Sequence, residues 1–385
     1  MSLPPPALLA QTMRLAAAEA RKWLGATSPN PPVGAAALAA DGRVLAVAAH
    51  HRAGEAHAET ALLHMLRKGD GVMERAATAD GTVNTPSPSI SRIDTLCVTL
   101  EPCNHHGLTP PCTEAIIAAG IRRVVIGTRD PNPHVTGGGI ERLQAAGVDV
   151  ITGVAEDECR QLIHAFAYKA QTGKAFVTVK RAFRRSDGDG VMEGTALSLG
   201  TVGTPSPPPE SMIPPAGQKT FTSASSLCLA HRLRKKADAI LTGSGTILAD
   251  NPLFTVRHVQ DHPNKRRWLA ILDRRGRVPQ AYIDAAKTRG LDAVIYRDIE
   301  TALSDLAAKG AQDVLVEAGP ALAQNLLDLG LWAMSVTIRQ AETDRIDVAF
   351  NPRETLPFDA NHFGWDTVLP EECLSSPLEG EEVKT

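Results

Sequence analysis

The chain has 385 residues, a formal net charge of −3 and a hydrophobic fraction of 43%. That length accommodates two domains of ordinary size, each with its own core. The nearly balanced charge predicts no basic surface for a polyanion, so we do not expect a nucleic-acid partner. Apolar runs fall short of the roughly 20 residues of a membrane helix, and the N-terminus lacks a signal-peptide pattern. We therefore expect a cytoplasmic protein with no membrane partner.

The first part of the chain predicts an α/β domain over residues 1–152. An Ala-rich helix precedes two apolar segments that flank Asp41-Gly42, a pair typical of hairpin turns. Strand and helix patterns then alternate, which is typical of a layered α/β domain. In chain order we expect a helix at 8–25, strands at 33–39 and 44–49, a helix from about His57, a strand at 95–100, a helix at 113–119, a strand at 122–127, and a helix and a strand within 139–152.

The most informative chemical pattern is His57-Ala58-Glu59, followed by Pro102-Cys103 and later by Cys112. One imidazole and two thiols would leave the fourth position of a tetrahedral zinc ion open, as in catalytic zinc sites. Glu59 would then be available to move protons. Zinc nucleobase deaminases carry a similar signature, but only two residues separate their cysteines, whereas eight do so here. The sequence thus predicts that His57, Cys103 and Cys112 bind Zn²⁺ and that Glu59 is catalytic.

Two other interpretations of this region stay open. His105 and His106 lie between the two cysteines and could compete as zinc ligands, or line the pocket instead. The cluster could also be a structural zinc site in a binding protein without catalytic activity. Structural zinc sites normally have four protein ligands, whereas only three are expected here. An acidic residue beside the ligands that does not itself bind zinc, such as Glu59, also argues against a structural site.

Residues 153–172 are expected to form a helical connector to a second α/β domain over residues 173–367. Residues from about 351 are rich in proline and acids, so we expect a poorly ordered tail there, with 368–385 outside the domain. The expected elements are a strand at 175–180, a helix at 223–236, strands at 239–242, 268–272 and 292–296, a helix at 301–309, a strand at 313–316, a helix at 321–329 and a last strand at 333–338.

A short repeat interrupts both domains. Gly69–Glu74 recurs as Gly188–Glu193, and Thr85–Pro88 recurs in the same register as Thr204–Pro207. Two copies cannot stack into a solenoid, which needs at least three. Their Gly, Pro, Ser and Thr content is typical of surface loops. We interpret the segments at about 69–92 and 188–210 as inserted loops without a catalytic role.

The second domain has two candidate ligand loops. Gly243–Thr246 follows an expected strand, and Gly319-Pro320 opens a helix after another. Loops at the carboxyl ends of strands in open α/β sheets bind ligands, and a helix N-terminus can hold a phosphate. Neither loop has the G-x-G-x-x-G fingerprint, so the residues alone indicate a nucleotide only weakly.

Taken together, the motifs resemble the RibD family, the bifunctional deaminase/reductases of riboflavin biosynthesis. The long spacing between Cys103 and Cys112 distinguishes this family from cytidine and tRNA-adenosine deaminases. The resemblance is carried by Ser28–Gly34, His50, Ala53–Glu55, His57–Glu59, Thr99–Gly107, Thr109–Cys112, Asp130–Pro133, Ala239–Gly243, Thr246–Pro252, Thr255, Arg257 and Val316–Pro320.

The resemblance implies an N-terminal cytidine-deaminase-like three-layer domain and a C-terminal dihydrofolate-reductase-like α/β domain. The first would hydrolyse the ring amine of 2,5-diamino-6-ribosylamino-4(3H)-pyrimidinone 5′-phosphate, with Asn30 and His50 binding this small-molecule substrate. The second would reduce the ribosyl chain to ribityl with NADPH. The family also leads us to expect a homo-oligomer. The reductase residues carried over are Thr246, Asp250, Gly319, Pro320 and Ala321 for NADPH, and Arg234, Arg257 and Glu317 for the substrate.

The second domain also departs from the family pattern. After Lys180 the usual Ser-Leu-Asp-Gly is replaced by Arg181–Ser186, and Gln218 and Thr220 stand where the family has Ser and Trp. The alternative to a bifunctional enzyme is therefore a monofunctional deaminase whose second domain is degraded or only binds ligands.

Overall fold

The computed structural model describes residues 3–68, 93–105, 110–132, 138–183, 223–341 and 344–369. Both predicted inserted loops lie outside these ranges. The described residues form two compact units. The first comprises the residues up to Ala175 together with 307–312 and 355–369, and the second comprises the others. The boundaries expected at residues 152 and 172 stay a prediction.

The first unit is built on a five-stranded sheet with the strand order β2-β1-β3-β4-β5. Strand β1 is antiparallel to β2 and β3, whereas β3, β4 and β5 run parallel. All six residues of β3 are buried, as expected for a strand covered on both faces. The strands are β1 Gly34–Leu38, β2 Val44–Ala49, β3 Thr95–Leu100, β4 Arg123–Thr128 and β5 Asp149–Thr152.

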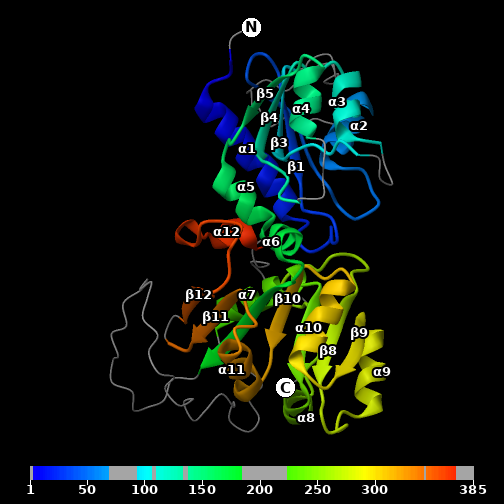
Figure 1. The fold of residues 1–385 in the computed structure, drawn as a ribbon, viewed down its shortest axis with the longest axis vertical. Helices are drawn as coiled ribbons and strands as arrows, with labels where there is room; N and C mark the ends of the chain where they lie inside the picture. The colour runs from blue at the N-terminus through cyan, green and yellow to red at the C-terminus, as the bar shows by residue number, and fades with distance from the viewer. Residues whose placement is uncertain are drawn as a thin grey trace, which may run out of the picture. The chain divides into compact units, whose positions relative to one another are not determined.

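Helices cover both faces of this sheet (Figure 1). Helices α1 (Pro6–Arg21) and α5 (Glu156–Leu162) lie on one face; α2 (Ala58–Lys68), α3 (Cys112–Ala118) and α4 (Gly139–Ala145) lie on the other. Helix α6 (His164–Thr172) follows α5. A Cβ atom on Gly34 would lie 1.9 Å from the carbonyl oxygen of Ala16, so only glycine lets α1 approach β1 this closely. The predicted three-layer, deaminase-like arrangement is confirmed.

The second unit is built on a seven-stranded sheet with the order β12-β11-β6-β10-β7-β8-β9. Six strands are parallel and only the edge strand β12 is antiparallel. The predicted α/β architecture of this half is confirmed. The strands are β6 Phe176–Phe183, β7 Ala239–Gly243, β8 Arg267–Leu272, β9 Leu291–Tyr296, β10 Asp313–Glu317, β11 Met334–Arg339 and β12 Arg345–Phe350.

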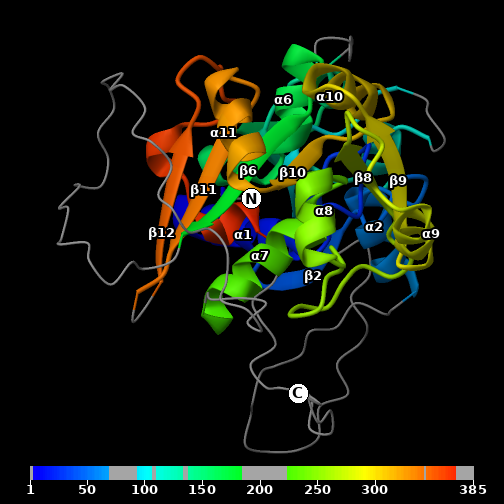
Figure 2. The same cartoon turned by 90° about the horizontal axis from the view of Figure 1, so that it is seen from below.

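The helices of this unit also lie on two faces (Figure 2). Three helices lie in connections along which the chain crosses the sheet toward β9. They are α7 (Ala224–Lys236) between β6 and β7, α8 (Ser244–Asp250) between β7 and β8, and α9 (Gln280–Thr288) between β8 and β9. Two helices lie in connections that cross the sheet in the opposite direction: α10 (Ile299–Ala308) between β9 and β10, and α11 (Pro320–Asp328) between β10 and β11. Because such crossovers are right-handed, the change of direction moves α10 and α11 to the other face.

Three elements of the second unit were not predicted. Helices α8 and α9 are only seven and nine residues long, too short for a clear 3.6-residue period. Strand β12 carries Arg345 and Asp347 on an exposed sheet edge, where charged residues are common. The strand predicted at 333–338 is therefore not the last one.

The prediction of a poorly ordered tail from residue 351 is wrong for residues 351–369. This segment contains the 3₁₀ helix η2 (Ala360–His362) and helix α12 (Trp365–Val368). Asn351, Phe358 and Leu369 are buried, so the apolar side chains outweigh the loop-like composition. No helix in the described part of the chain has both the length and the apolar character needed to cross a membrane.

The segment 355–369 belongs to the first unit and is bound there by Gln161 of α5. The Gln161 side chain is buried, with its Nε2 donating to the His362 carbonyl at 2.8 Å. Its Oε1 accepts from the Gly364 N–H at 3.0 Å. Phe358 adds a perpendicular ring contact with His164, the centroids 6.2 Å apart. One buried amide thus satisfies a donor and an acceptor of the C-terminal backbone.

We predict that Gln161→Leu lowers the free energy of unfolding of the first unit by about 2 kcal/mol, because it removes two hydrogen bonds between a buried side chain and the C-terminal backbone, each worth about 1 kcal/mol. Urea unfolding followed by tryptophan fluorescence measures this change. Gln144→Leu, on an exposed position of the same unit, is the matched control and should change stability little. Equal effects of the two substitutions would contradict the prediction.

Candidate functional site

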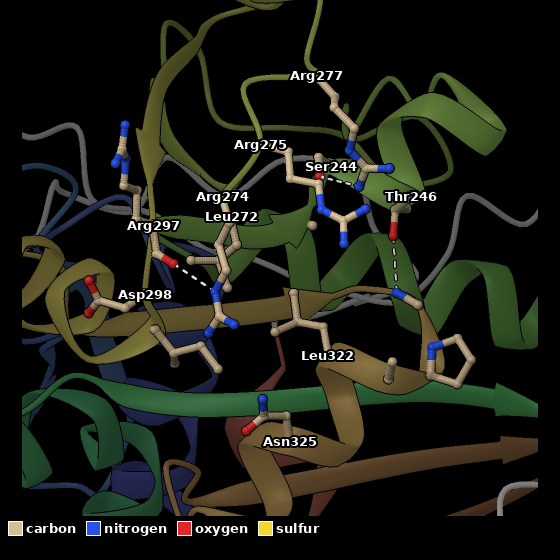
Figure 3. A pocket seen from close by; sticks show the side chains of 16 residues that line it. Ser244, Thr246, Leu272, Arg274, Arg275, Arg277, Arg297, Asp298, Leu322 and Asn325 are labelled. Carbon is tan, nitrogen blue, oxygen red and sulfur yellow. Dashed lines mark hydrogen bonds between the residues drawn. The ribbon is translucent and has the colours of Figure 1, made fainter.

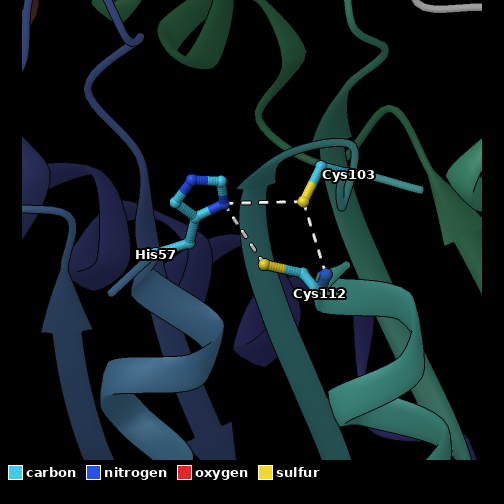
Figure 4. Close-up of side chains that lie close together, drawn as sticks. All are labelled: His57, Cys103 and Cys112. Atoms are coloured by element: carbon cyan, nitrogen blue, oxygen red, sulfur yellow. Dashed lines mark hydrogen bonds between the residues drawn. The ribbon is translucent and has the colours of Figure 1, made fainter. Parts of the chain in front are cut away.

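The first candidate site lies where β3 ends and two helices begin. His57 immediately precedes α2, and its carbonyl accepts the first helical hydrogen bond, from Ala61. Cys103 follows β3, and Cys112 is the first residue of α3. Figure 4 shows the three side chains pointing toward one another. The structure therefore brings together all three predicted zinc ligands from separate segments.

The donor atoms fit a zinc ion. His57 Nδ1 lies 3.5 Å from Cys103 Sγ and 3.4 Å from Cys112 Sγ. All three atoms lie within 4.8 Å of one another. Zn–N and Zn–S bonds of tetrahedral sites place such nitrogen and sulfur atoms about 3.6 Å apart. The distances and the mixed nitrogen and sulfur donors match a three-ligand zinc site.

The surroundings favour a thiolate at Cys103. Hydrogen bonding with Cys112, aided by His57 and opposed by burial, lowers the pKa of the Cys103 thiol. The Cys112 backbone N–H lies 3.3 Å from the same sulfur and donates to it. Metals bind the thiolate rather than the thiol. Cys103 is therefore in the form that a metal needs.

Glu59 lies beside this cluster in the first turn of α2 and is only 3% exposed. Burial raises the pKa of its carboxyl group to about 6. A carboxyl group with a pKa near neutrality can both accept and return a proton. The predicted proton carrier is therefore adjacent to the predicted ligands, and its environment suits that task.

Asn30 and His50 also lie at this site. His50 follows β2, and its ring makes a perpendicular contact with His57 at 5.2 Å between centroids. His50 Nδ1 donates to the Ala56 carbonyl at 3.0 Å, which leaves Nε2 to accept from the Asn30 amide at 3.1 Å. Burial lowers the pKa of His50, which favours this neutral tautomer. Because the side-chain nitrogen of Asn30 donates to His50, the side-chain oxygen Oδ1 of Asn30 is held in place as a hydrogen-bond acceptor.

His105 and His106 are the two alternative zinc ligands that the sequence left open. His105 is exposed and is absent from the one metal-ligating cluster found among the described residues, which contains His57, Cys103 and Cys112. His106 lies outside the described residues.

The second candidate site lies where the strand order of the seven-stranded sheet changes direction. From β7 the chain continues to β8, whereas from β10 it continues to β11 on the far side of β6. Ligands of open α/β sheets bind at such a switch point, beyond the carboxyl ends of the strands. Here the Gly319 N–H, which precedes α11, donates to Thr246 Oγ1 in the first turn of α8 at 3.0 Å and joins the segments that follow β10 and β7.

A pocket of about 460 Å³ opens at this point. Thr246, Gly319, Pro320 and Ala321 line it, four of the five residues expected to contact NADPH. Asp250, the fifth, is exposed in the last turn of α8 and does not line this pocket. Figure 3 shows arginine side chains on the opposite wall, from the loops after β8 and β9.

The residues expected to bind the reductase substrate lie around Glu317, the last residue of β10. Glu317 is buried and paired with Lys180 at 2.9 Å and with Arg234 at 2.6 Å. Burial alone would raise the pKa of Glu317, but the charges of Arg234 and Lys180 outweigh it and lower the pKa to about 2. Arg234 is thus engaged within the protein. The exposed Arg257, whose backbone N–H donates to His231 Nδ1 at 2.8 Å, remains the candidate for a phosphate contact.

Sequence reasoning missed several residues of the second site. Lys180, the last residue before the departure from the family pattern, is a partner of Glu317 that the motifs do not predict. The arginines of the pocket were not singled out, although Asp273-Arg-Arg-Gly-Arg directly follows a predicted strand. A cluster of like charges at the carboxyl end of a strand was the signal that could have identified them.

Two family models match the chain. The cytidine and deoxycytidylate deaminase zinc-binding region matches residues 8–128, and the RibD C-terminal domain matches residues 213–333. The first unit is accordingly a zinc-binding deaminase domain, and the second is a RibD C-terminal domain.

Relatives cover both halves. The RibD riboflavin biosynthesis protein of Corynebacterium ammoniagenes is 31% identical over 84% of this chain and 83% of its own length. That of Aquifex aeolicus is 36% identical over 64% of this chain, but the match spans little more than half of that relative, 57%. A solved deaminase/reductase from Thermotoga maritima is 30% identical and covers 87% of each chain with a TM-score of 0.65.

We predict that the Glu317 cluster makes the second unit sensitive to acid. Because the folded-state pKa is depressed, its stabilisation is present above the unfolded pKa of about 4.5 and is lost as the pH falls toward 2. Glu317→Gln should cost about 3 kcal/mol at neutral pH and flatten the pH dependence of stability between those values.

Urea unfolding at a series of pH values measures this effect. Asp347→Asn, which removes an exposed carboxylate paired with Arg339 and Arg345, is the control and should change stability little. Parallel pH profiles of wild type and Glu317→Gln would count against the prediction.

Proposed function

Because the chain belongs to the RibD family of riboflavin-biosynthesis proteins, we propose that it is a bifunctional enzyme acting on a small phosphoribosylated pyrimidine. It first removes the ring amine of 2,5-diamino-6-ribosylamino-4(3H)-pyrimidinone 5′-phosphate by hydrolysis, and then reduces the ribosyl chain to ribityl. The observation that carries the proposal is the convergence of His57, Cys103 and Cys112 beside the buried Glu59.

For the deamination, His57, Cys103 and Cys112 would hold Zn²⁺, which supplies a Lewis acid that activates water near neutral pH. Glu59 is the proton carrier: as water adds to the ring carbon and the C–N bond to the amine breaks, it transfers the two protons of the water, one to the ring nitrogen and one to the amine that leaves as ammonia. The fixed Asn30–His50 pair supports binding of the substrate, with the Asn30 carbonyl accepting from its hydroxyl or amino groups.

For the reduction, a RibD C-terminal domain implies NADPH as the hydride donor. The switch-point pocket with Thr246 and Gly319 would hold the coenzyme, with its pyrophosphate near the start of α11. Glu317 ends β10, Lys180 lies opposite it within the adjacent strand β6, and Arg234 comes from α7. These three side chains, joined by hydrogen bonds, would order the substrate. Arg257 would contact the 5′-phosphate.

The zinc-ligand cluster, the switch-point pocket and the two family matches together favour this function over a monofunctional deaminase. Glu59 likewise speaks against a purely structural zinc site. A homo-oligomer and a cytoplasmic location stay predictions from the family resemblance and the composition. No nucleic-acid or membrane partner is part of the proposal.

We predict that Glu59→Gln retains stoichiometric zinc but lowers ammonia release by about 100-fold or more, because the amide cannot carry the proton. Metal analysis and an ammonia assay on the same preparation measure the two quantities. Glu114→Gln, at a half-exposed position of α3, is the matched control. Unchanged turnover in Glu59→Gln would refute the assignment of Glu59.

We also predict that the two activities can be separated. The Glu59→Gln protein, supplied with substrate that has already been deaminated, should oxidise NADPH at the wild-type rate. Absorbance at the NADPH band follows this reaction. Ammonia release by the wild-type protein without any NADPH oxidation would instead establish the monofunctional alternative.

A further inference from the structure

The switch-point pocket has an unusually cationic wall. Arg274, Arg275 and Arg277 from the loop after β8 and Arg297 after β9 line it, against a single carboxylate, Asp298. Asp298 accepts from the Thr301 N–H at 2.7 Å as the cap of α10, and Figure 3 shows its carboxylate turned away from Arg274. The wall therefore presents an excess of positive charge to whatever enters.

Among the described residues this charge is compensated only in part, by the Coulomb attraction between Asp298 and Arg274. No carboxylate oxygen in them lies within 4 Å of any of the four guanidinium groups, whereas at the other end of β8 both Arg266 and Arg267 are paired with aspartates. The partners at the pocket are neutral oxygens. Arg277 donates to Ser244 Oγ at 3.1 Å, and Arg274 Nε donates to the Arg297 carbonyl at 3.0 Å. Guanidinium groups held in this way remain available to an anionic ligand.

The buried Asp273 side chain holds the backbone of the loop that carries Arg274, Arg275 and Arg277. Asp273 is buried, and its two oxygens accept from the backbone N–H groups of Arg275 and Val278 at 3.3 and 2.8 Å. A fixed backbone positions the side chains without help from the ligand. Such preorganisation is what a selective anion site requires.

The arginines divide between two ends of the pocket. Arg277 is tied to Ser244 at the start of α8, beside Thr246 and the switch-point crevice. Arg274 is hydrogen-bonded to the carbonyl of Arg297, which follows β9, and β9 lies two strands from β7 in the sheet. A dinucleotide with its pyrophosphate in the crevice would extend its adenosine over β8 toward β9. Its 2′-phosphate, where one is present, would then lie on the side of Arg274.

We propose that Arg274 and Arg275 bind the 2′-phosphate of NADPH and thereby select it over NADH, whereas Arg277 serves the pyrophosphate that both coenzymes share. This assignment rests on the proposed reductase function. Guanidinium groups bind phosphates through paired, charge-assisted hydrogen bonds. NADH offers only a hydroxyl group at the same place, so the two arginines gain nothing from it.

Coenzyme binding to the full-length protein tests the assignment without reference to turnover. Dissociation constants of NADPH and NADH are measured by isothermal titration for wild type, Arg274→Ala/Arg275→Ala, Arg277→Ala and Arg266→Ala. The double variant should lose roughly tenfold or more in NADPH affinity while its NADH affinity stays unchanged. Arg277→Ala should weaken the binding of both coenzymes equally. Arg266→Ala, at the residue that precedes the opposite end of β8, should weaken neither.

The probe 2′,5′-ADP, compared with 5′-AMP, isolates the adenosine end. Wild type should prefer 2′,5′-ADP, and the double variant should lose that preference. The assignment is overturned if the double variant keeps the NADPH affinity of wild type, or weakens NADH as much as NADPH. A wild-type protein that binds neither coenzyme would overturn the reductase function itself and the assignment with it.

Discussion

Parallel strands in a right-handed crossover fold end at the same edge of their sheet, and both candidate sites depend on this constraint. In the first unit the end of β3 carries Cys103 to the starts of α2 and α3, where His57 and Cys112 lie. In the second unit the ends of β7 and β10 bring Thr246 and Gly319 into hydrogen-bond contact across 73 residues of chain. In each unit the direction of the strands decides which segments of the chain meet at the site, whatever side chains those segments carry.

Two buried glutamates illustrate how the surroundings then decide a residue's role. In the described part of the chain no lysine or arginine charge acts on Glu59, and burial raises its pKa to about 6, so it can exchange protons. Glu317 is equally buried, but Lys180 and Arg234 lower its pKa to about 2 and keep it charged. The same side chain at the same depth is suited to proton transfer in one unit and to fixing cations in the other.

The sequence was sufficient for the zinc cluster and most strands, because spacing and apolar runs are local properties. His57, Cys103 and Cys112 could be grouped from residue type alone. The short helices α8 and α9 and the charged edge strand β12 could not be found, since their form depends on the strands beside them. Asp250 was carried over by motif position, yet the end of α8 turns it outside the pocket, an orientation that only the fold determines.

The described part of the departure from the family after Lys180, Arg181–Phe183, is accommodated by strand pairing. Strand β6 continues to Phe183, where Arg181 pairs with Thr337 of β11 in register and its guanidinium donates to the Thr337 hydroxyl at 3.2 Å. Lys180 stays opposite Glu317 of β10 in the parallel ladder and keeps its ion pair. Arg181–Phe183 thus continue β6 along β11 and leave the ion pair between Lys180 and Glu317 in place. This argues for a working second domain over a degraded one.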